Sequence, residues 1–219
     1  TNLSQGWLHK DPLNKVGVRA YQSTDNMKKI NWKASARHNK LESNIYKPSY
    51  DREVHIFLST LTTENWWLGI DRNRLEILII YAASIANYSL KKDYQVGLYS
   101  DGMIKRSSSF LELKPAKGNV HRERLLSNLA MLQVADKLKF PGILNKKKKQ
   151  IKIGSTIIII ISIIDNKTKK ILNKYRKNYN VSLIIVGNQS FNIKNLKGIK
   201  VYQVEKEEDW HEIKKMGLV

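Results

Sequence analysis

The sequence contains no cysteine and no long hydrophobic run. Without cysteine, the chain cannot form a disulfide scaffold, a zinc ribbon, a cysteine nucleophile or a dithiol redox centre. Its longest apolar run, residues 157–164, is interrupted by Ser162 and is far shorter than the ~20 residues that a membrane-spanning helix needs. The 219 residues are enough to bury a core without a metal or a disulfide, so we expect one or two globular domains.

Acidic residues are also scarce, 19 against 39 Lys and Arg, which gives a formal net charge of +20. More than half of this excess lies after residue 145, where the chain has 17 basic and six acidic residues. Two stretches, Lys146–Lys149 and Lys167–Lys177, could bind the phosphates of nucleic acid or of anionic lipid. A solvated, solubilising surface is the simpler interpretation. Because aromatic residues do not interleave with these lysines in a stacking pattern, nucleic acid is not favoured as a partner.

The character of the sequence changes near residue 52. Residues 1–52 are polar, with short strand-like pieces at 16–21, 29–33 and 41–46, which predicts a β-rich lead-in. In residues 53–219, strand-like runs alternate with amphipathic helical patterns, which predicts an α/β domain with a mostly parallel sheet and helices on both faces. Strands are expected at 53–58, 94–99, 110–113, 155–164, 181–186 and 199–204, helices at 74–90, 120–138, 165–179 and 207–216, a turn at 100–102 and a charged loop at 146–152.

Candidate ligand groups follow these strands, because open α/β sheets bind ligands beyond the carboxyl ends of their strands. Hydroxyls and a few carboxylates or amides occur there: Ser59, Thr60, Thr62, Thr63, Asp101, Asp165 and Asn166. Such oxygens could hold a hard divalent cation. The same residue types are also the usual formers of turns, which is the plainer interpretation.

The motifs of common catalytic sites are missing from the sequence. The glycines do not form a phosphate-binding loop, no Gly-x-Ser-x-Gly nucleophile motif occurs, and the five histidines show no ligand spacing. No pair of carboxylates is placed for acid–base catalysis. We therefore expect a protein that is not an enzyme and that uses no cofactor.

Residues 11–37 combine large amphipathic side chains with charges. Three cations of this stretch could form charge-assisted hydrogen bonds with Asp25 or with an acidic partner. Trp32 and Tyr21 are residue types that dominate interface energies. The alternative is a self-contained structural unit in which Asp25 is paired internally and Trp32 is packed. The candidate interaction surface comprises Arg19, Tyr21, Asp25, Trp32, Lys33 and Arg37.

Residues 17–21 read Gly-Val-Arg-Ala-Tyr, a turn ending in Asp25 follows, and residues 30–37 read Ile-Asn-Trp-Lys-Ala-Ser-Ala-Arg. This stretch resembles the signature of the bacterial domain-of-unknown-function 58 family. The resemblance continues in Leu75-Glu76, in residues 82–86 and in residues 96–99, and it covers most of residues 11–140. It implies that the rest of the chain is similar to a von Willebrand factor A domain.

The resemblance also implies a cellular setting. Family members usually have two membrane-spanning helices upstream of the signature, with the globular part on the cytoplasmic face of the bacterial cell membrane. They are commonly encoded beside a MoxR-type AAA+ ATPase and other von Willebrand A-like proteins. A chain that begins at Thr1 without an initiator Met fits an excised part of such a protein. We therefore expect a non-catalytic protein-interaction module of a membrane-anchored protein, acting with the ATPase in assembly or maturation of a complex. The alternative is a basic module that binds nucleic acid or anionic lipid.

The sequence departs from the family and superfamily patterns at several positions. Ser23-Thr24 precedes Asp25 where Pro-Gly is usual, and Asn31 replaces a common Asp. The metal-dependent adhesion site of the wider superfamily needs Asp-x-Ser-x-Ser after the first strand. The matching positions here are Ser59, Leu61 and Thr63, so the carboxylate and one hydroxyl are missing. We expect no metal to be bound in this way.

Overall fold

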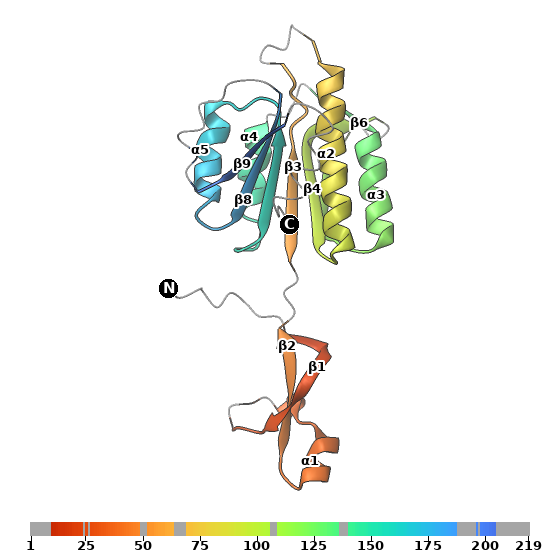
Figure 1. Cartoon of the computed structure of the whole chain (residues 1–219), viewed down its shortest axis with the longest axis vertical. Helices are drawn as coiled ribbons and strands as arrows, with labels where there is room; N and C mark the ends of the chain where they lie inside the picture. Colours follow the sequence, from red (N-terminus) through yellow and green to blue (C-terminus); the bar gives the residue numbers. More distant parts are fainter. Residues whose placement is uncertain are drawn as a thin grey trace. The chain divides into compact units, whose positions relative to one another are not determined.

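The computed structural model describes residues 10–23, 25, 27–48, 52–63, 69–105, 109–135, 140–187, 196 and 198–204. The chain divides into two compact units, residues 1–51 and residues 52–219, called here the small unit and the large unit. Each unit has a sheet of its own (Figure 1).

The small unit is built on two antiparallel strands, β1 (Lys10–Ala20) and β2 (Glu42–Pro48). Between them lie a short 3-10 helix, η1 (Met27–Lys29), and helix α1 (Trp32–His38). The strand predicted at 29–33 is therefore wrong: Lys29 ends η1, Ile30 forms only an isolated β-bridge to Ser43, and Trp32 begins α1. Asn31 accepts a hydrogen bond from the amide of Ala34 through its side-chain oxygen (3.0 Å), and this cap starts a helix at Trp32.

The large unit has an α/β fold around one sheet, with strand order β5-β4-β3-β7-β8-β9 and the short β6 paired to β4. β3, β4, β7, β8 and β9 are mutually parallel, whereas β5 and β6 run antiparallel to β4. The strands are β3 (Glu53–Leu58), β4 (Gln95–Ile104), β5 (Phe110–Ala116), β6 (Leu132–Gln133), β7 (Thr156–Ile161), β8 (Asn180–Val186) and β9 (Lys200–Val204). This arrangement confirms the predicted fold class.

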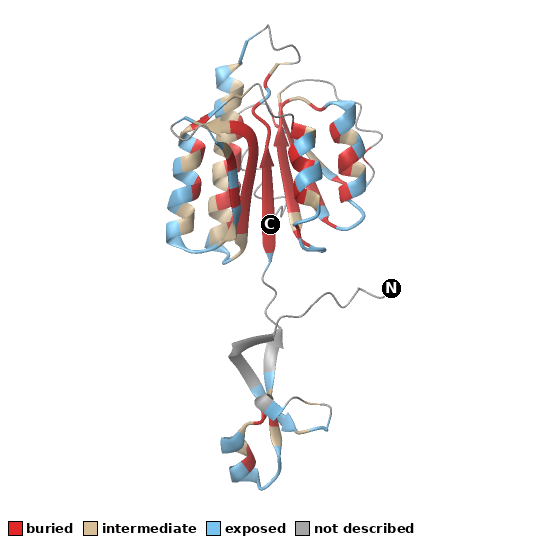
Figure 2. Cartoon of the chain, turned by 180° about the vertical axis from the view of Figure 1, so that it is seen from behind, coloured by how far each residue is buried: buried red, intermediate tan, exposed pale blue. Residues whose placement is uncertain are grey.

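Helices cover both faces of this sheet (Figure 2). They are α2 (Arg72–Lys91), α3 (Asn119–Ala130), α4 (Phe140–Lys148) and α5 (Asn166–Tyr175). α2 and α3 pack on one face, against Ile56 and Ile158, and α4 and α5 pack on the other, against Phe57 and Ile159. β7 is consequently buried on both sides, as its run of isoleucines predicts. Within the described part of the chain, none of the helices has the length and apolar character required to cross a bilayer.

Three segments of the large unit differ from the sequence-based expectation. The helix predicted over 120–138 ends at Ala130, because the next residues pair with β4 as β6. The charged loop predicted from residue 146 begins later, because α4 extends to Lys148. The turn predicted at 100–102 is part of β4, which continues to Ile104. The helix predicted at 207–216 lies outside the described residues.

Candidate functional site

Part of the candidate interaction surface forms a turn around Asp25 in the small unit. The Arg19 guanidinium donates to Asp25 Oδ1 (2.6 Å), and the amide of Gln22 donates to Oδ2 (3.1 Å). The Tyr21 hydroxyl donates to the backbone oxygen of Asp25 (3.2 Å). The Gln22 hydrogen bond, together with the Arg19 charge, lowers the pKa of Asp25. Three of the six predicted residues thus meet in one turn, and Asp25 is paired internally.

The other three predicted residues, Trp32, Lys33 and Arg37, lie on α1 and are exposed. Trp32 keeps 67% of its surface exposed, so it is not packed within the small unit. Lys33 and Arg37 lie four residues apart, so they are neighbours on the helix, and no carboxylate of the described residues pairs with either. α1 therefore presents an exposed aromatic ring and, on another side of the helix, two cations that no described carboxylate neutralises.

Among the residues of the small unit whose burial the structure describes (17–23, 25, 27, 29–45), more large apolar side chains are exposed than buried. In that range Ile30 is the only large hydrophobic side chain that is buried. Its exposed counterparts are Val18, Met27, Trp32, Leu41 and Ile45. Because exposed apolar surface in a folded unit is typical of interaction sites, this composition favours contact with another surface.

A second candidate site lies at the carboxyl ends of β3 and β4, where the sequence placed Ser59, Thr60 and Asp101. These residues are buried and bonded to one another. The Ser59 hydroxyl donates to Asp101 Oδ2 (2.8 Å), and Thr60 donates to Oδ1 through both its amide (2.7 Å) and its hydroxyl (2.9 Å). Burial raises the pKa of Asp101, although these donors oppose the rise.

The remaining polar groups near this end close turns and cap helices. Asp71 caps α2 by accepting from the amide of Arg74 (3.0 Å), and the Thr62 hydroxyl accepts from the amide of Asp71 (3.0 Å). The Thr63 hydroxyl donates to the carbonyl of Gly69 (2.7 Å). Asp165 caps α5, which begins at Asn166, by accepting from the amide of Thr168 (2.8 Å). These residues act as turn formers and helix caps.

The donor set does not fit a metal-dependent adhesion site. Ser59 stands at the position of the superfamily carboxylate, Leu61 is apolar and 44% exposed, and Thr63 is bonded to Gly69. The buried carboxylate among the described residues at this edge, Asp101, already accepts three hydrogen bonds. In the part of the chain that the structure describes, no cluster of three or more His, Asp or Glu residues is placed to hold a metal.

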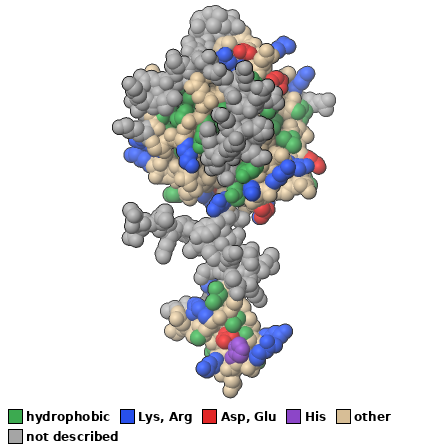
Figure 3. Space-filling model, viewed as in Figure 1, with side chains coloured by type: hydrophobic (Ala, Val, Ile, Leu, Met, Phe, Trp, Pro, Cys, Tyr) green, Lys and Arg blue, Asp and Glu red, His purple; other side chains and the backbone are tan. Residues whose placement is uncertain are grey.

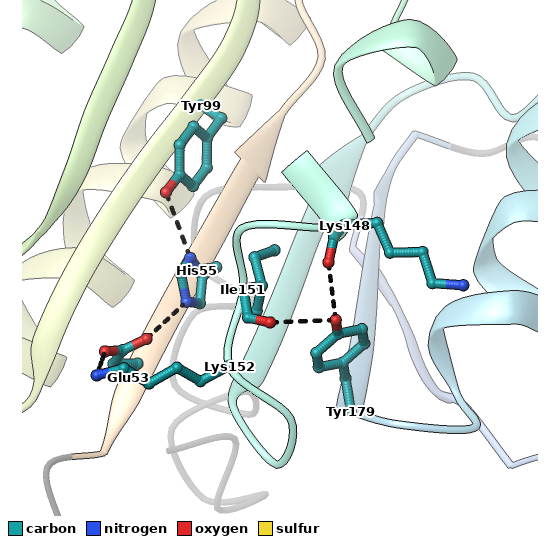
Figure 4. Close-up of polar contacts among 7 residues, drawn as sticks. All are labelled: Glu53, His55, Tyr99, Lys148, Ile151, Lys152 and Tyr179. Carbon is teal, nitrogen blue, oxygen red and sulfur yellow. Dashed lines mark hydrogen bonds and ion pairs between the residues drawn. The ribbon is translucent and has the colours of Figure 1, made fainter. Parts of the chain in front are cut away.

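Sequence reasoning missed a buried polar cluster on the α4 side of the sheet (Figure 4). His55 Nε2 lies 3.3 Å from Glu53 Oε2, and His55 Nδ1 lies 3.4 Å from the Tyr99 hydroxyl. Lys152 donates to the other oxygen of Glu53 (2.5 Å). Burial lowers the pKa of His55 even though Glu53 opposes this, so the neutral ring fits, with Nε2–H donating to Glu53 and Nδ1 accepting from Tyr99.

A buried lysine completes this cluster. Lys147 bonds to Glu112 and lies over the ring of Tyr99, 5.4 Å from its centroid. Burial, with the charges of Glu112 and Glu53, raises the pKa of Tyr99 to about 12. One signal of the cluster was present in the sequence: Glu53 and His55 alternate in an apolar strand and so share one face.

The chain matches the family model described as protein of unknown function DUF58 over residues 17–192. This range runs from β1 to beyond β8 and so includes both candidate sites. The match confirms the resemblance read from residues 17–37. No curated protein matches the chain in sequence.

Solved structures of von Willebrand A domains share the fold. The mussel byssus proximal thread matrix protein 1 has a TM-score of 0.52 and 10% identity, over 77% of this chain and 47% of that one. The VWA domain of SpRpn10 has a TM-score of 0.50 and 14% identity, over 77% of this chain and 97% of that one. A von Willebrand factor type A protein from Catenulispora acidiphila has a TM-score of 0.48 and 8% identity, over 81% of this chain and 43% of that one. This chain thus spans less than half the length of the mussel protein and of the Catenulispora protein. At identities this low, the matches show a shared fold and carry nothing about function.

Proposed function

The chain belongs to the DUF58 family, and from this premise we propose that it is a non-catalytic protein-interaction module that contacts its partner through the small unit. The observation that carries the proposal is the exposed surface of α1, a short helix that carries Trp32, Lys33 and Arg37 without burying any of them. A solvated tryptophan on a folded helix contributes little to the stability of its own unit. Buried against a partner, its exposed part is worth about 3 kcal/mol before the cost of association.

The charges of α1 point to an acidic partner surface. Lys33 and Arg37 repel each other at helix spacing, which costs the isolated helix a few tenths of a kcal/mol. A carboxylate of the partner placed between the two cations would attract both and so offset this repulsion. Asp25, the partner that the sequence offered for these cations, does not neutralise them, because Arg19 and the Gln22 amide bond to its two oxygens.

The polar groups of the large unit support a role without catalysis. Asp71 and Asp165 cap helices, and Asp101 accepts three hydrogen bonds from the loop that follows β3. Groups bonded in this way stabilise turns and helix ends, whereas a catalytic acid or base must lie within hydrogen-bond distance of a substrate.

For the partner we propose a MoxR-type AAA+ ATPase, together with other von Willebrand A-like proteins, in the assembly or maturation of a complex. We place this activity at the cytoplasmic face of the bacterial cell membrane, with anchoring through a segment that this sequence does not contain. Support for this setting comes from the family resemblance of residues 17–37.

The test is a binding measurement between the 219-residue chain and the purified MoxR-type ATPase of the same organism, with and without ATP. Trp32→Ala is expected to weaken binding at least tenfold, because a tryptophan at the centre of an interface is worth about 2 kcal/mol or more. The matched control is Ile70→Ala, which truncates another half-exposed apolar residue, in the large unit.

A charge test separates electrostatics from apolar contact. Lys33→Glu with Arg37→Glu is expected to slow association and to weaken binding, whereas the same change at Arg72 and Lys105 leaves it intact. Hydrogen exchange of the α1 amides shows whether each variant stays folded. Undiminished binding by folded Trp32→Ala and by the charge-reversed variant would exclude this surface, and a wild-type chain that does not bind the ATPase would exclude the partner.

A further inference from the structure

One end of the large unit concentrates exposed positive charge. The parallel strands β3, β4, β7, β8 and β9 all begin there, and α2, α4 and α5 end there. We call this the basic end and define it by its exposed cations: Arg52, Lys91, Lys92, Lys149, Lys177 and Lys200. In Figure 3, Lys and Arg side chains are seen along the lower edge of the large unit, where these strands begin.

Among the described residues, no carboxylate forms an ion pair with any of these six cations. In the described turns and strand starts at the basic end, the acidic residues are Glu53 and Asp93. Each is already bonded to a further lysine, Glu53 to Lys152 (2.5 Å) and Asp93 to Lys117 (3.0 Å). Within the described part of the large unit, the six cations of the basic end are therefore excess charge.

Two apolar side chains protrude from the same end. Val120, in the first turn of α3, is 82% exposed, and Ile153, in the turn before β7, is 79% exposed. They are the most exposed large hydrophobic residues among those described in the large unit. The turn that carries Ile153 is fixed in place, because the amide of Gly154 donates to the carbonyl of Asn178 (2.9 Å), next to Lys177.

We propose that the basic end is a contact surface for an anionic lipid bilayer. The ammonium groups would bind headgroup phosphates, while Ile153 and Val120 enter the interfacial region. Lysines close to an anionic surface contribute about 1 kcal/mol each, so several together give useful affinity without a groove or a defined headgroup pocket. Apolar side chains among them add burial in the acyl boundary.

Helix electrostatics explain only part of this pattern. A lysine in the last turn of a helix complements the negative end of the helix dipole, which accounts for Lys91. It does not account for Arg52 and Lys200, which lie at strand starts, or for two protruding apolar side chains.

A bilayer suits this end better than nucleic acid does. Single-stranded nucleic acid is held by aromatic faces as well as by charge. Each of the half-buried tyrosines at this end already has a cation over one ring face: Arg52 lies over Tyr94 (5.6 Å to the centroid) and Lys92 over Tyr88 (5.8 Å). Exposed Ile153 would gain nothing from a phosphate backbone, whereas an acyl boundary would bury it.

The test is co-sedimentation of the 219-residue chain with vesicles of phosphatidylcholine alone, or of phosphatidylcholine with about one-third phosphatidylglycerol. We expect binding to the anionic vesicles only, weakened by salt. Replacing Lys91, Lys149 and Lys177 by Gln is expected to lower the affinity about a hundredfold. The matched control replaces Arg72, Lys105 and Lys167 by Gln, which removes the same charge at the opposite end of the strands and is expected to have a much smaller effect.

A second variant separates the apolar contribution from charge. Ile153→Ser is expected to weaken vesicle binding severalfold without changing its dependence on salt. Equal losses in the two triple variants, or equal binding to both kinds of vesicle, would overturn the proposal. So would a short single-stranded DNA that displaces the chain from vesicles and loses its own binding in the Lys91, Lys149 and Lys177 variant, because the end would then be a nucleic-acid surface.

This inference stands apart from the proposed function, because the two rest on different units. Trp32→Ala is expected to leave vesicle binding unchanged, and the Lys91, Lys149 and Lys177 variant is expected to keep its affinity for the protein partner in solution. Failure of either test therefore leaves the other proposal standing.

Discussion

Thr60 donates two hydrogen bonds to the same oxygen of Asp101, one from its backbone amide (2.7 Å) and one from its hydroxyl (2.9 Å). The two residues belong to different segments, the loop after β3 and the strand β4. Ser59 bonds to the second oxygen. The Asp101 carboxylate therefore holds the loop after β3 against the neighbouring strand, at the edge where α/β proteins place their ligands.

Asp101→Ala is expected to lower the free energy of unfolding by about 2 kcal/mol or more, because it leaves three buried donors without an acceptor. Asp101→Asn keeps one oxygen for Thr60, and the Ser59 hydroxyl can turn to accept from the new amide, so a cost of about 1 kcal/mol is expected. Urea denaturation measures both variants. Equal stability of the alanine variant and the wild type would show that these bonds do not support the fold.

Mg²⁺ or Mn²⁺ is expected to leave the midpoint of thermal unfolding unchanged, because the only buried carboxylate at this edge among the described residues is saturated by donors. A specific ion at a hundred times its Kd would add about 2.7 kcal/mol, which corresponds to roughly 5–10 °C for a chain of this size. A rise of that size in the wild type, absent from Asp101→Asn, would contradict the expectation.

The stability of the large unit is expected to fall as the pH drops below about 6.5, through His55. Burial lowers the folded-state pKa of His55 below its ordinary value of 6.5, with Glu53 opposing and Lys152 assisting. Below pH 6.5 His55 is therefore protonated in the unfolded chain before it is protonated in the folded chain. This difference lowers the free energy of unfolding by up to about 1.4 kcal/mol per pH unit. Thermal unfolding between about pH 7.5 and 5.5 measures this.

The control for this pH dependence is His55→Gln, which retains a donor and an acceptor between Glu53 and Tyr99 but does not titrate in this range. Its melting temperature is expected to vary less with pH than that of the wild type. Parallel curves for the two proteins would assign the dependence to other groups.

Gly102→Ala is expected to destabilise the large unit by about 1–3 kcal/mol. A Cβ at this position would lie 2.7 Å from the backbone oxygen of Gln133 and 2.8 Å from Thr60 Cγ2, so the β4–β6 pairing would have to shift. Gly142→Ala is the matched control: open space surrounds that position in α4, and alanine favours the helix there. Thermal unfolding of the pair gives the comparison, and equal midpoints would show that the close approach at Gly102 is easily relieved.

The parts of the fold that local pattern determines could be predicted from the sequence. β3 begins and ends at the residues predicted from its strand-like pattern, Glu53 and Leu58, and the spacing of small and apolar residues located α2 to within two residues. α4 was missed because its apolar side is short and runs into four lysines. Lys147 is buried there, and its partner Glu112 is 35 residues away in sequence, which no local pattern reveals.

At the candidate sites, too, local pattern predicted some features, whereas others depend on how distant parts of the chain meet. The rule that ligand groups gather at the carboxyl ends of parallel strands brought Ser59 and Asp101 together in the prediction, and the structure shows them bonded. The rule could not show that the carboxylate would be saturated, since the two Thr60 bonds depend on the path of the loop. The cap at Asn31 was missed because a five-residue strand-like pattern outweighed one capping side chain.

The position of β3 between β4 and β7 has a consequence for synthesis on the ribosome. β4 begins soon after α2, but β7 begins only at Thr156, about a hundred residues after β3. At ordinary translation rates this delay lasts about 5–20 s. During that interval one edge of an apolar strand has no neighbour, and Phe57 lacks the isoleucines of β7 that later cover it. A chaperone that shields this edge would therefore act while the middle third of the chain is translated.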